Sequence, residues 1–85
     1  MAGRPDVSVV LPTRDRPAFL ADAIASVMSQ TVTSWELVVV DDGSTTPATV
    51  PSDPRIHLVR LAESGGSARA RNIGVAHASA DAVAF

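Results

Sequence analysis

The fold is decided by the stretch Trp35-Glu36-Leu37-Val38-Val39-Val40-Asp41-Asp42-Gly43-Ser44. Its apolar run, Leu37–Val40, is rich in β-branched side chains and unbroken by polar residues, which is typical of a strand buried on both faces of a sheet. The run ends at Asp-Asp-Gly-Ser, residue types that favour a turn. The stretch therefore predicts an interior strand over 35–40 that is followed directly by two carboxylates.

The residues before this strand predict a first strand and a helix. Val7–Leu11 is a mostly β-branched run that Pro12 is expected to stop. Asp15-Arg16-Pro17 favours a helix start, because proline in the first turn wastes no hydrogen-bond donor and Asp15 or a neighbour can cap the open N–H groups. The helix is expected to end over residues 30–33. Its apolar stripe, at spacings i, i+4, i+7 and i+8, is Leu20, Ile24, Val27 and Met28.

The residues after the interior strand predict a loop, a strand, a helix and the beginning of another strand. Three prolines and several small polar residues make 44–54 a loop. Ile56–Val59 is expected to form a short third strand, Ser67–Ala78 a second long helix, and Ala82–Phe85 the start of a fourth strand. The apolar faces of the second helix are expected to come from Ala68, Ile73, Val75 and Ala76.

This order of elements predicts an α/β fold with a parallel sheet and flanking helices, in the order β-α-β-β-α-β. Adjacent parallel strands need a long connection that packs back on the sheet, and helices supply it. With 46% hydrophobic and 19% charged residues, the 85-residue chain has the composition of a folded segment, and we expect residues 1–85 to form one small domain.

Charge and composition exclude several classes of function. A net charge of −2 gives no reason to expect nucleic-acid binding, and the longest apolar run is far shorter than a membrane span. The absence of cysteine excludes disulfides and thiolate metal sites. There is no glycine-rich dinucleotide or P-loop motif. Two histidines without ligand spacing do not make a zinc site.

Three polar segments follow the expected strands. In open parallel sheets, ligands bind outside the carboxyl ends of the strands, so segments 12–15, 41–44 and 63–66 should line one crevice.

At these segments the sequence resembles the family 2 glycosyltransferases. The similarity begins with Val7–Pro17 and continues through Ser29-Gln30-Thr31, Trp35–Ser44, Gly65-Gly66 and Ala70–Gly74, in the order and spacing of the family. It covers almost the whole chain. The resemblance implies a truncated GT-A fold, Rossmann-like, of which residues 1–85 are the nucleotide-sugar-binding half.

The resemblance also implies roles for individual residues. Asp42 would contact the base, Pro12 and Thr13 would contribute backbone and hydroxyl contacts, and Arg69 or Arg71 could reach the diphosphate. Arg14 stands where many relatives have an aromatic residue that stacks on the base, and its flat guanidinium can also stack. The complete set implied to bind the nucleotide sugar is Pro12, Thr13, Arg14, Asp15, Asp41, Asp42, Arg69 and Arg71.

For the full-length protein, the resemblance implies an enzyme of polysaccharide biosynthesis. It would transfer a sugar from a nucleotide diphosphate sugar, with UDP as the expected carrier, to an unknown acceptor that is a glycan, a lipid or a protein. Mg²⁺ or Mn²⁺ would be required, but the metal-binding Asp-any-Asp motif and the catalytic base follow Phe85 in relatives. We therefore expect no catalytic or metal-ligating residue within this chain, and a location in the cytoplasm or at the cytoplasmic face of the membrane.

Other interpretations of the same residues stay open. The chain could be a non-catalytic, truncated nucleotide-binding fragment, or a receiver-like phosphoacceptor domain, although the latter would need a lysine and the chain has none. Asp41-Asp42 could be an ordinary turn, and Asp15 a helix cap and not a ligand. Arg69 and Arg71 could lie on a solvated face.

Overall fold

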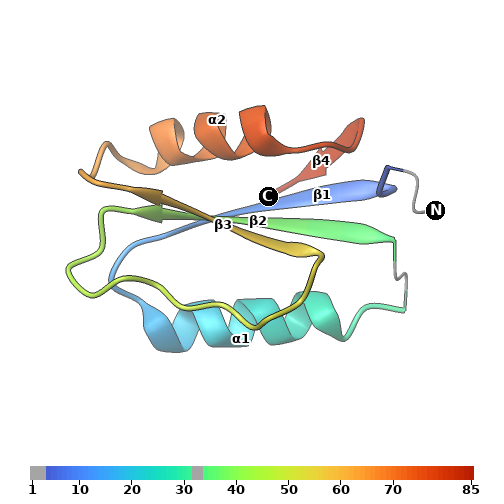
Figure 1. The fold of residues 1–85 in the computed structure, drawn as a ribbon, viewed down its shortest axis with the longest axis horizontal. Coiled ribbons are helices and arrows are strands. Elements are labelled where there is room, and N and C mark those ends of the chain that lie inside the picture. Colours follow the sequence, from blue (N-terminus) through green and yellow to red (C-terminus); the bar gives the residue numbers. More distant parts are fainter. Residues whose placement is uncertain (1–3, 32–33) are drawn as a thin grey trace.

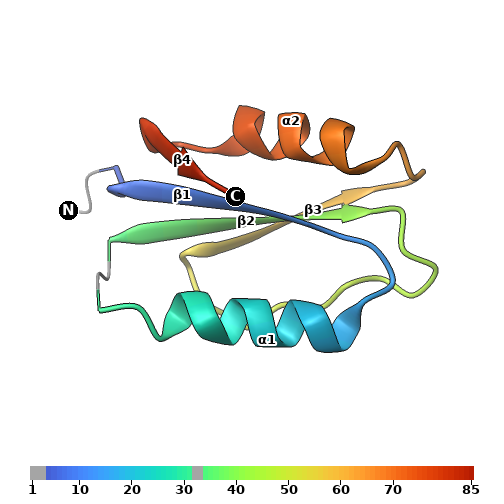
Figure 2. The ribbon, with the colours of Figure 1, turned by 180° about the vertical axis from the view of Figure 1, so that it is seen from behind.

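The computed structural model describes residues 4–31 and 34–85. A parallel sheet with strand order β3-β2-β1-β4 lies between two helices, α1 on one face and α2 on the other (Figure 1; Figure 2 shows the same layers from behind). This confirms the predicted α/β class and element order. The elements are β1 (Val7–Thr13), α1 (Pro17–Met28), β2 (Trp35–Asp42), β3 (Ile56–Leu61), α2 (Ser67–His77) and β4 (Ala82–Ala84).

Strand β2 is the centre of the core, as predicted, and all eight of its residues are buried. Alternate side chains point to opposite faces of a strand. Leu37 and Val39 therefore pack with Leu20 and Ile24 of α1, while Val38 and Val40 pack on the other face with α2. Burial on both faces explains why this strand has no polar residue between Leu37 and Val40.

The strands extend further towards their carboxyl ends than predicted. Pro12 does not stop β1, which continues through Thr13, and β2 includes Asp41 and Asp42. Proline cannot donate to a ladder, but β4 pairs with β1 only at Val7–Val9, so β1 has a single neighbouring strand at Pro12. The two aspartates are consequently strand residues with fixed directions, and not members of a flexible turn.

Two predictions about α1 need correction. No side chain caps the helix: Arg16 occupies the N-cap position, and Asp15 turns away with a left-handed φ of 50°. Met28, a predicted member of the apolar stripe, is 42% exposed. Successive helical residues are about 100° apart, so Met28 lies at the margin of the stripe that Leu20 and Ile24 define. The predicted helix end at 30–33 falls partly outside the described residues, and α1 ends at Met28.

Of the predicted apolar faces of α2, only Ile73 packs against the core, and the assignment of the other three residues was wrong. The helix buries Ala70 and Gly74, whereas Ala68, Val75 and Ala76 are exposed and Ile73 is only partly buried. Two small residues, one turn apart, let the helix approach the sheet closely. A Cβ added at Gly74 would lie 2.3 Å from Cγ1 of Val10. The absence of a side chain at Gly74 therefore allows the close packing, although glycine lowers helix stability.

Replacing Gly74 by alanine tests this packing. On an exposed helix the change would stabilise by up to about 1 kcal/mol. Here we expect destabilisation by about 1–3 kcal/mol, because the new methyl group overlaps Val10. Urea denaturation measures the difference, and the loss in the double variant G74A/V10A should be smaller than the sum of the losses in the two single variants, because the overlap disappears with the Val10 methyl groups. Stabilisation by G74A alone would contradict the close approach.

A buried polar network ties the sheet together far from the carboxyl ends. Glu36, which is 6% exposed, accepts hydrogen bonds through Oε2 from Ser8 Oγ, from Ser79 N (2.8 Å) and from Ser79 Oγ (2.9 Å). Ala80 N donates in turn to Ser8 Oγ at 3.0 Å. His57 Nε2 lies 3.5 Å from Glu36 Oε1. The network joins β1, β2 and the connection into β4, which fixes where β4 begins.

This network predicts a pH dependence of stability. Burial raises the pKa of Glu36, but the hydrogen bonds from Ser8 and Ser79, with the nearby His57, outweigh burial and lower it below 4.5. Since the folded pKa lies below the unfolded value, the contribution to stability is complete above about pH 4.5 and is lost as pH falls through the folded pKa. Glu36→Gln should cost about 1–3 kcal/mol at pH 7 and flatten the acid branch of a stability-against-pH curve. Parallel stability-against-pH curves for the wild type and Glu36→Gln would contradict this role of Glu36.

Among residues 4–31 and 34–85, neither helix has the length and apolar character needed to cross a bilayer.

Candidate functional site

The connections that follow β1, β2 and β3 meet at one edge of the sheet, where the three strands end (left side of Figure 1). Thr13 and Asp42, from adjacent strands, line the same hollow of about 280 Å³. This is the arrangement expected for a crevice at the carboxyl ends of parallel strands. The described lining residues are Pro12, Thr13, Arg14, Arg16, Phe19, Asp42, Ser64, Gly66 and Ser67.

Asp42 organises the loop that leads into α2. Its Oδ1 accepts a hydrogen bond from Gly65 N at 2.9 Å, and its Oδ2 accepts from Gly66 N at 3.0 Å and from Ser64 Oγ at 3.2 Å. The bond from Gly65 N is the main reason that the pKa of Asp42 is lowered, with Ser64, Gly66 and the charge of Arg14 adding to it against the effect of burial. Asp42 is therefore a charged, oriented carboxylate at neutral pH.

Asp41 has a different environment, because neighbouring strand residues point to opposite faces. It is fully buried, and its two oxygens accept from Ser44 N at 3.0 Å and Ala48 N at 2.9 Å. Burial raises the pKa of Asp41, but the bonds from Ala48 and Ser44 outweigh it and lower the pKa below 3.8. Asp41 does not line the hollow shared by Thr13 and Asp42, and it holds the loop that follows β2.

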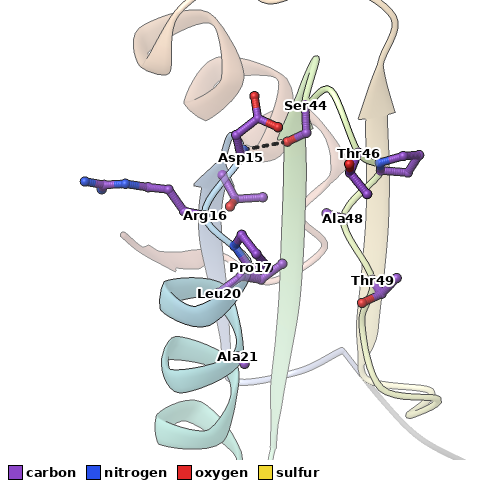
Figure 3. A pocket seen from close by; sticks show the side chains of 11 residues that line it. Asp15, Arg16, Pro17, Leu20, Ala21, Ser44, Thr46, Ala48 and Thr49 are labelled. Carbon is purple, nitrogen blue, oxygen red and sulfur yellow. Dashed lines mark hydrogen bonds between the residues drawn. The ribbon is translucent and has the colours of Figure 1, made fainter.

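Asp15 joins the loops that follow β1 and β2. Its N–H donates to Ser44 Oγ at 2.8 Å, and its Oδ1 accepts from Thr45 N at 2.8 Å. Figure 3 shows the first of these bonds at the rim of a second hollow, of about 380 Å³. Pro17 and Leu20 lie on one side of that hollow, and Thr46, Ala48 and Thr49 on the other (Figure 3). These two hydrogen bonds, which we call the Asp15 clasp, direct Asp15 to the loop after β2 and explain why it does not cap α1.

The predicted residues are only partly brought together. Pro12, Thr13, Arg14 and Asp42 surround the first hollow. The Arg69 guanidinium instead donates to the Glu63 carbonyl oxygen at 3.3 Å. Arg71 lines a separate hollow with Ala68, Asn72 and Phe85. Neither arginine is among the described residues that line the first hollow.

Sequence reasoning missed two residues of the first hollow that come from the start of α1. These are Arg16, treated only as part of the helix start, and Phe19. One signal was available for Phe19: it lies next to Leu20 and off the apolar stripe, so a position in the core was already excluded. Its direction towards the ends of β1 and β2 depends on where α1 begins.

The described residues do not fit a metal site. Among residues 4–31 and 34–85, no three histidine, aspartate or glutamate side chains gather closely enough to hold an ion. The carboxylates of Asp41 and Asp42 already accept hydrogen bonds from the protein through both oxygens. No metal-dependent step is therefore assigned to these residues.

The chain is similar in sequence to bacterial proteins over nearly its whole length. It is 37% identical over 93 residues to the O-antigen biosynthesis protein RfbC of Myxococcus xanthus, covering 100% of this chain and 7% of that protein. It is 36% identical over 88 residues to the putative teichuronic acid biosynthesis glycosyltransferase TuaG of Bacillus subtilis (strain 168), covering 96% of the chain and 35% of TuaG.

A third relative, from Escherichia coli, is the UDP-Glc:alpha-D-GlcNAc-diphosphoundecaprenol beta-1,3-glucosyltransferase WfgD. It is 35% identical over 83 residues, with 93% of the chain and 33% of WfgD covered. The chain thus spans about a third or less of the length of these relatives. Residues 8–85 also match glycosyl transferase family 2. The parallel sheet, the motif order and this match agree, and the chain belongs to glycosyl transferase family 2.

Proposed function

We propose that the full-length protein transfers a sugar from a nucleoside diphosphate sugar, with UDP as the carrier, and that the first hollow binds the nucleoside. The observation that supports this most directly is the position of Asp42. Its carboxylate is charged and held by three protein donors, and it lines the same hollow as Thr13 and Pro12 at the carboxyl edge of the sheet.

The chemistry of Asp42 favours particular bases. An ionised carboxylate accepts hydrogen bonds and donates none, and it has room for about four. Asp42 uses one acceptor position on Oδ1 and two on Oδ2, which leaves Oδ1 able to accept from a ligand. Uracil presents an imide N–H in its hydrogen-bonding edge, whereas cytosine presents an unprotonated ring nitrogen at the same position. UDP should therefore bind better than CDP.

Thr13 adds a second polar contact. The residue is 6% exposed, it lines both hollows, and its hydroxyl can donate or accept a hydrogen bond. A site with such pre-positioned groups rejects ligands that leave those groups unpaired. We assign Thr13 a hydroxyl contact to the nucleoside, and Arg14 the contact with the base plane or the first phosphate.

The remaining parts of the proposal concern the complete protein. Mg²⁺ or Mn²⁺ is proposed as cofactor, with its ligands outside the described residues. The acceptor is a glycan, lipid or protein in polysaccharide biosynthesis. The name of WfgD describes a lipid-linked diphosphate acceptor. As part of the same proposal, we assign a lipid-linked acceptor at the cytoplasmic face of the membrane to this protein.

Calorimetry with the full-length protein tests the nucleotide assignment. We expect UDP to bind, and CDP to bind at least tenfold more weakly because its ring nitrogen faces the Asp42 carboxylate without a proton. GDP and dTDP carry bases that also present a ring N–H. Titrations with these two nucleotides test whether the hydrogen-bonding edge of the base or the size of the base determines the affinity. Absence of heat with all of these nucleotides, and with their sugar conjugates, would refute the proposed function.

A further inference from the structure

Phe19 is a large aromatic side chain exposed at the candidate site. It is the third residue of α1 and is 52% exposed, although α1 buries its apolar stripe against the sheet. Single exposed apolar residues are common and carry no meaning by themselves. Phe19 differs because it lines the same hollow as Pro12, Thr13, Arg14 and Asp42.

The surroundings of Phe19 match what a planar ring would need. The Arg16 guanidinium lies 5.5 Å from the centre of the Phe19 ring, so one side of the ring has a cationic neighbour. Thr13 and Asp42, at the ends of β1 and β2, line the same hollow as Phe19, and so does Arg14, which follows β1. Both Asp42 and Phe19 are held by regular elements, and this fixes their relative position.

The base therefore meets two kinds of contact in this hollow. A hydrogen bond to Asp42 distinguishes bases by the hydrogen-bonding edge that they present. Stacking on an aromatic ring provides affinity, since every base has a π-face. Position 14 carries arginine and no aromatic ring, so Phe19 is the aromatic residue among the described residues that line the hollow.

We propose that Phe19 stacks on one face of the base in the nucleotide site. This inference rests on the proposed function and adds a binding residue from α1 to a site otherwise built from strand ends. Arg16 holds the ring by its cation–π contact, and Asp42 selects the base that stacks there.

Tryptophan fluorescence provides a direct test with the full-length protein. Within residues 1–85 the one tryptophan is Trp35, which is 4% exposed in the core, and the wild type serves as the reference for any tryptophan elsewhere in the full-length protein. In Phe19→Trp, UDP should quench a fluorescence component that the wild type lacks, because the new indole contacts the base. Phe19→Ala should weaken UDP binding by about tenfold to a hundredfold, with inorganic pyrophosphate binding unchanged. Phe19→Leu should resemble alanine, since leucine is apolar but has no π-face.

Met28→Ala is the matched control. Met28 is an exposed apolar residue of the same helix, 42% exposed, and it lines neither hollow. Its replacement should leave the UDP dissociation constant unchanged, and circular dichroism melting checks that all variants fold. Equal UDP affinity of wild type and Phe19→Ala, or of wild type and Phe19→Leu, overturns the inference while leaving the proposed function intact. If the wild type binds no nucleotide, both fail.

Discussion

Replacing Asp42 by asparagine is expected to weaken UDP binding by about a hundredfold, which corresponds to about 2.7 kcal/mol. The asparagine amide retains one acceptor oxygen where the carboxylate had two, and its NH₂ group would face the N–H of Gly65 or of Gly66. The change therefore removes an acceptor from the base and loosens the turn before α2. Both effects lower affinity, and calorimetry with UDP measures their sum.

Asp22→Asn provides the control for this prediction. Asp22 lies exposed on α1 and lines neither hollow, so the same chemical change should leave UDP affinity unchanged. In Asp42→Asn the preference for UDP over CDP should also decrease, because an amide can rotate to donate to the cytosine ring nitrogen. Unchanged affinity and unchanged base preference in Asp42→Asn would contradict the role assigned to Asp42.

Replacing Asp41 by alanine is expected to lower the free energy of unfolding by about 3 kcal/mol. The change leaves the N–H groups of Ser44 and Ala48 without their carboxylate acceptor in a part of the chain where Asp41 itself is 0% exposed. Ser44 also accepts from Asp15 N, so the clasp between the loops after β1 and β2 should loosen as well. Urea denaturation gives the stability change, and limited proteolysis should show earlier cleavage within residues 44–50.

Asp81→Ala is the comparison for Asp41. Asp81 pairs with Arg4 at 2.6 Å, but the two side chains are 90% and 65% exposed. Exposed ion pairs contribute little because water competes for both charges. We expect the denaturation midpoint of Asp81→Ala to match that of the wild type. Similar losses in the two variants would show that burial of Asp41 does not decide its contribution.

The order of the elements could be predicted from local sequence, but their ends could not. The apolar run Leu37–Val40 favours an interior strand, and the stripe of Leu20 and Ile24 is expected to face a sheet. The continuation of β1 through Pro12 depends on the short length of β4, which leaves that side of Pro12 without a partner strand. No pattern within residues 7–13 reports the length of a strand that begins at Ala82.

The candidate site, too, could be predicted only in part from the sequence. That Asp42 and Thr13 lie together follows from parallel strands ending at one edge, which the alternation of strands and helices already predicts. That Asp15 clasps Thr45, and that Arg69 and Arg71 lie apart from the first hollow, depends on backbone angles and helix phase. A change of one residue in a helix start rotates every following side chain by about 100°.

The sequence by itself determined the α/β class, the interior position of β2 and the edge of the sheet at which polar groups gather, because these follow from hydrophobic periodicity and chain connectivity. The tertiary structure alone decided which polar groups face a ligand. Asp41 and Asp42 are adjacent and chemically identical, yet one is enclosed by Ser44 and Ala48 while the other lines a hollow. The physical reason is that a strand directs neighbours to opposite faces, and only packing determines which face is closed.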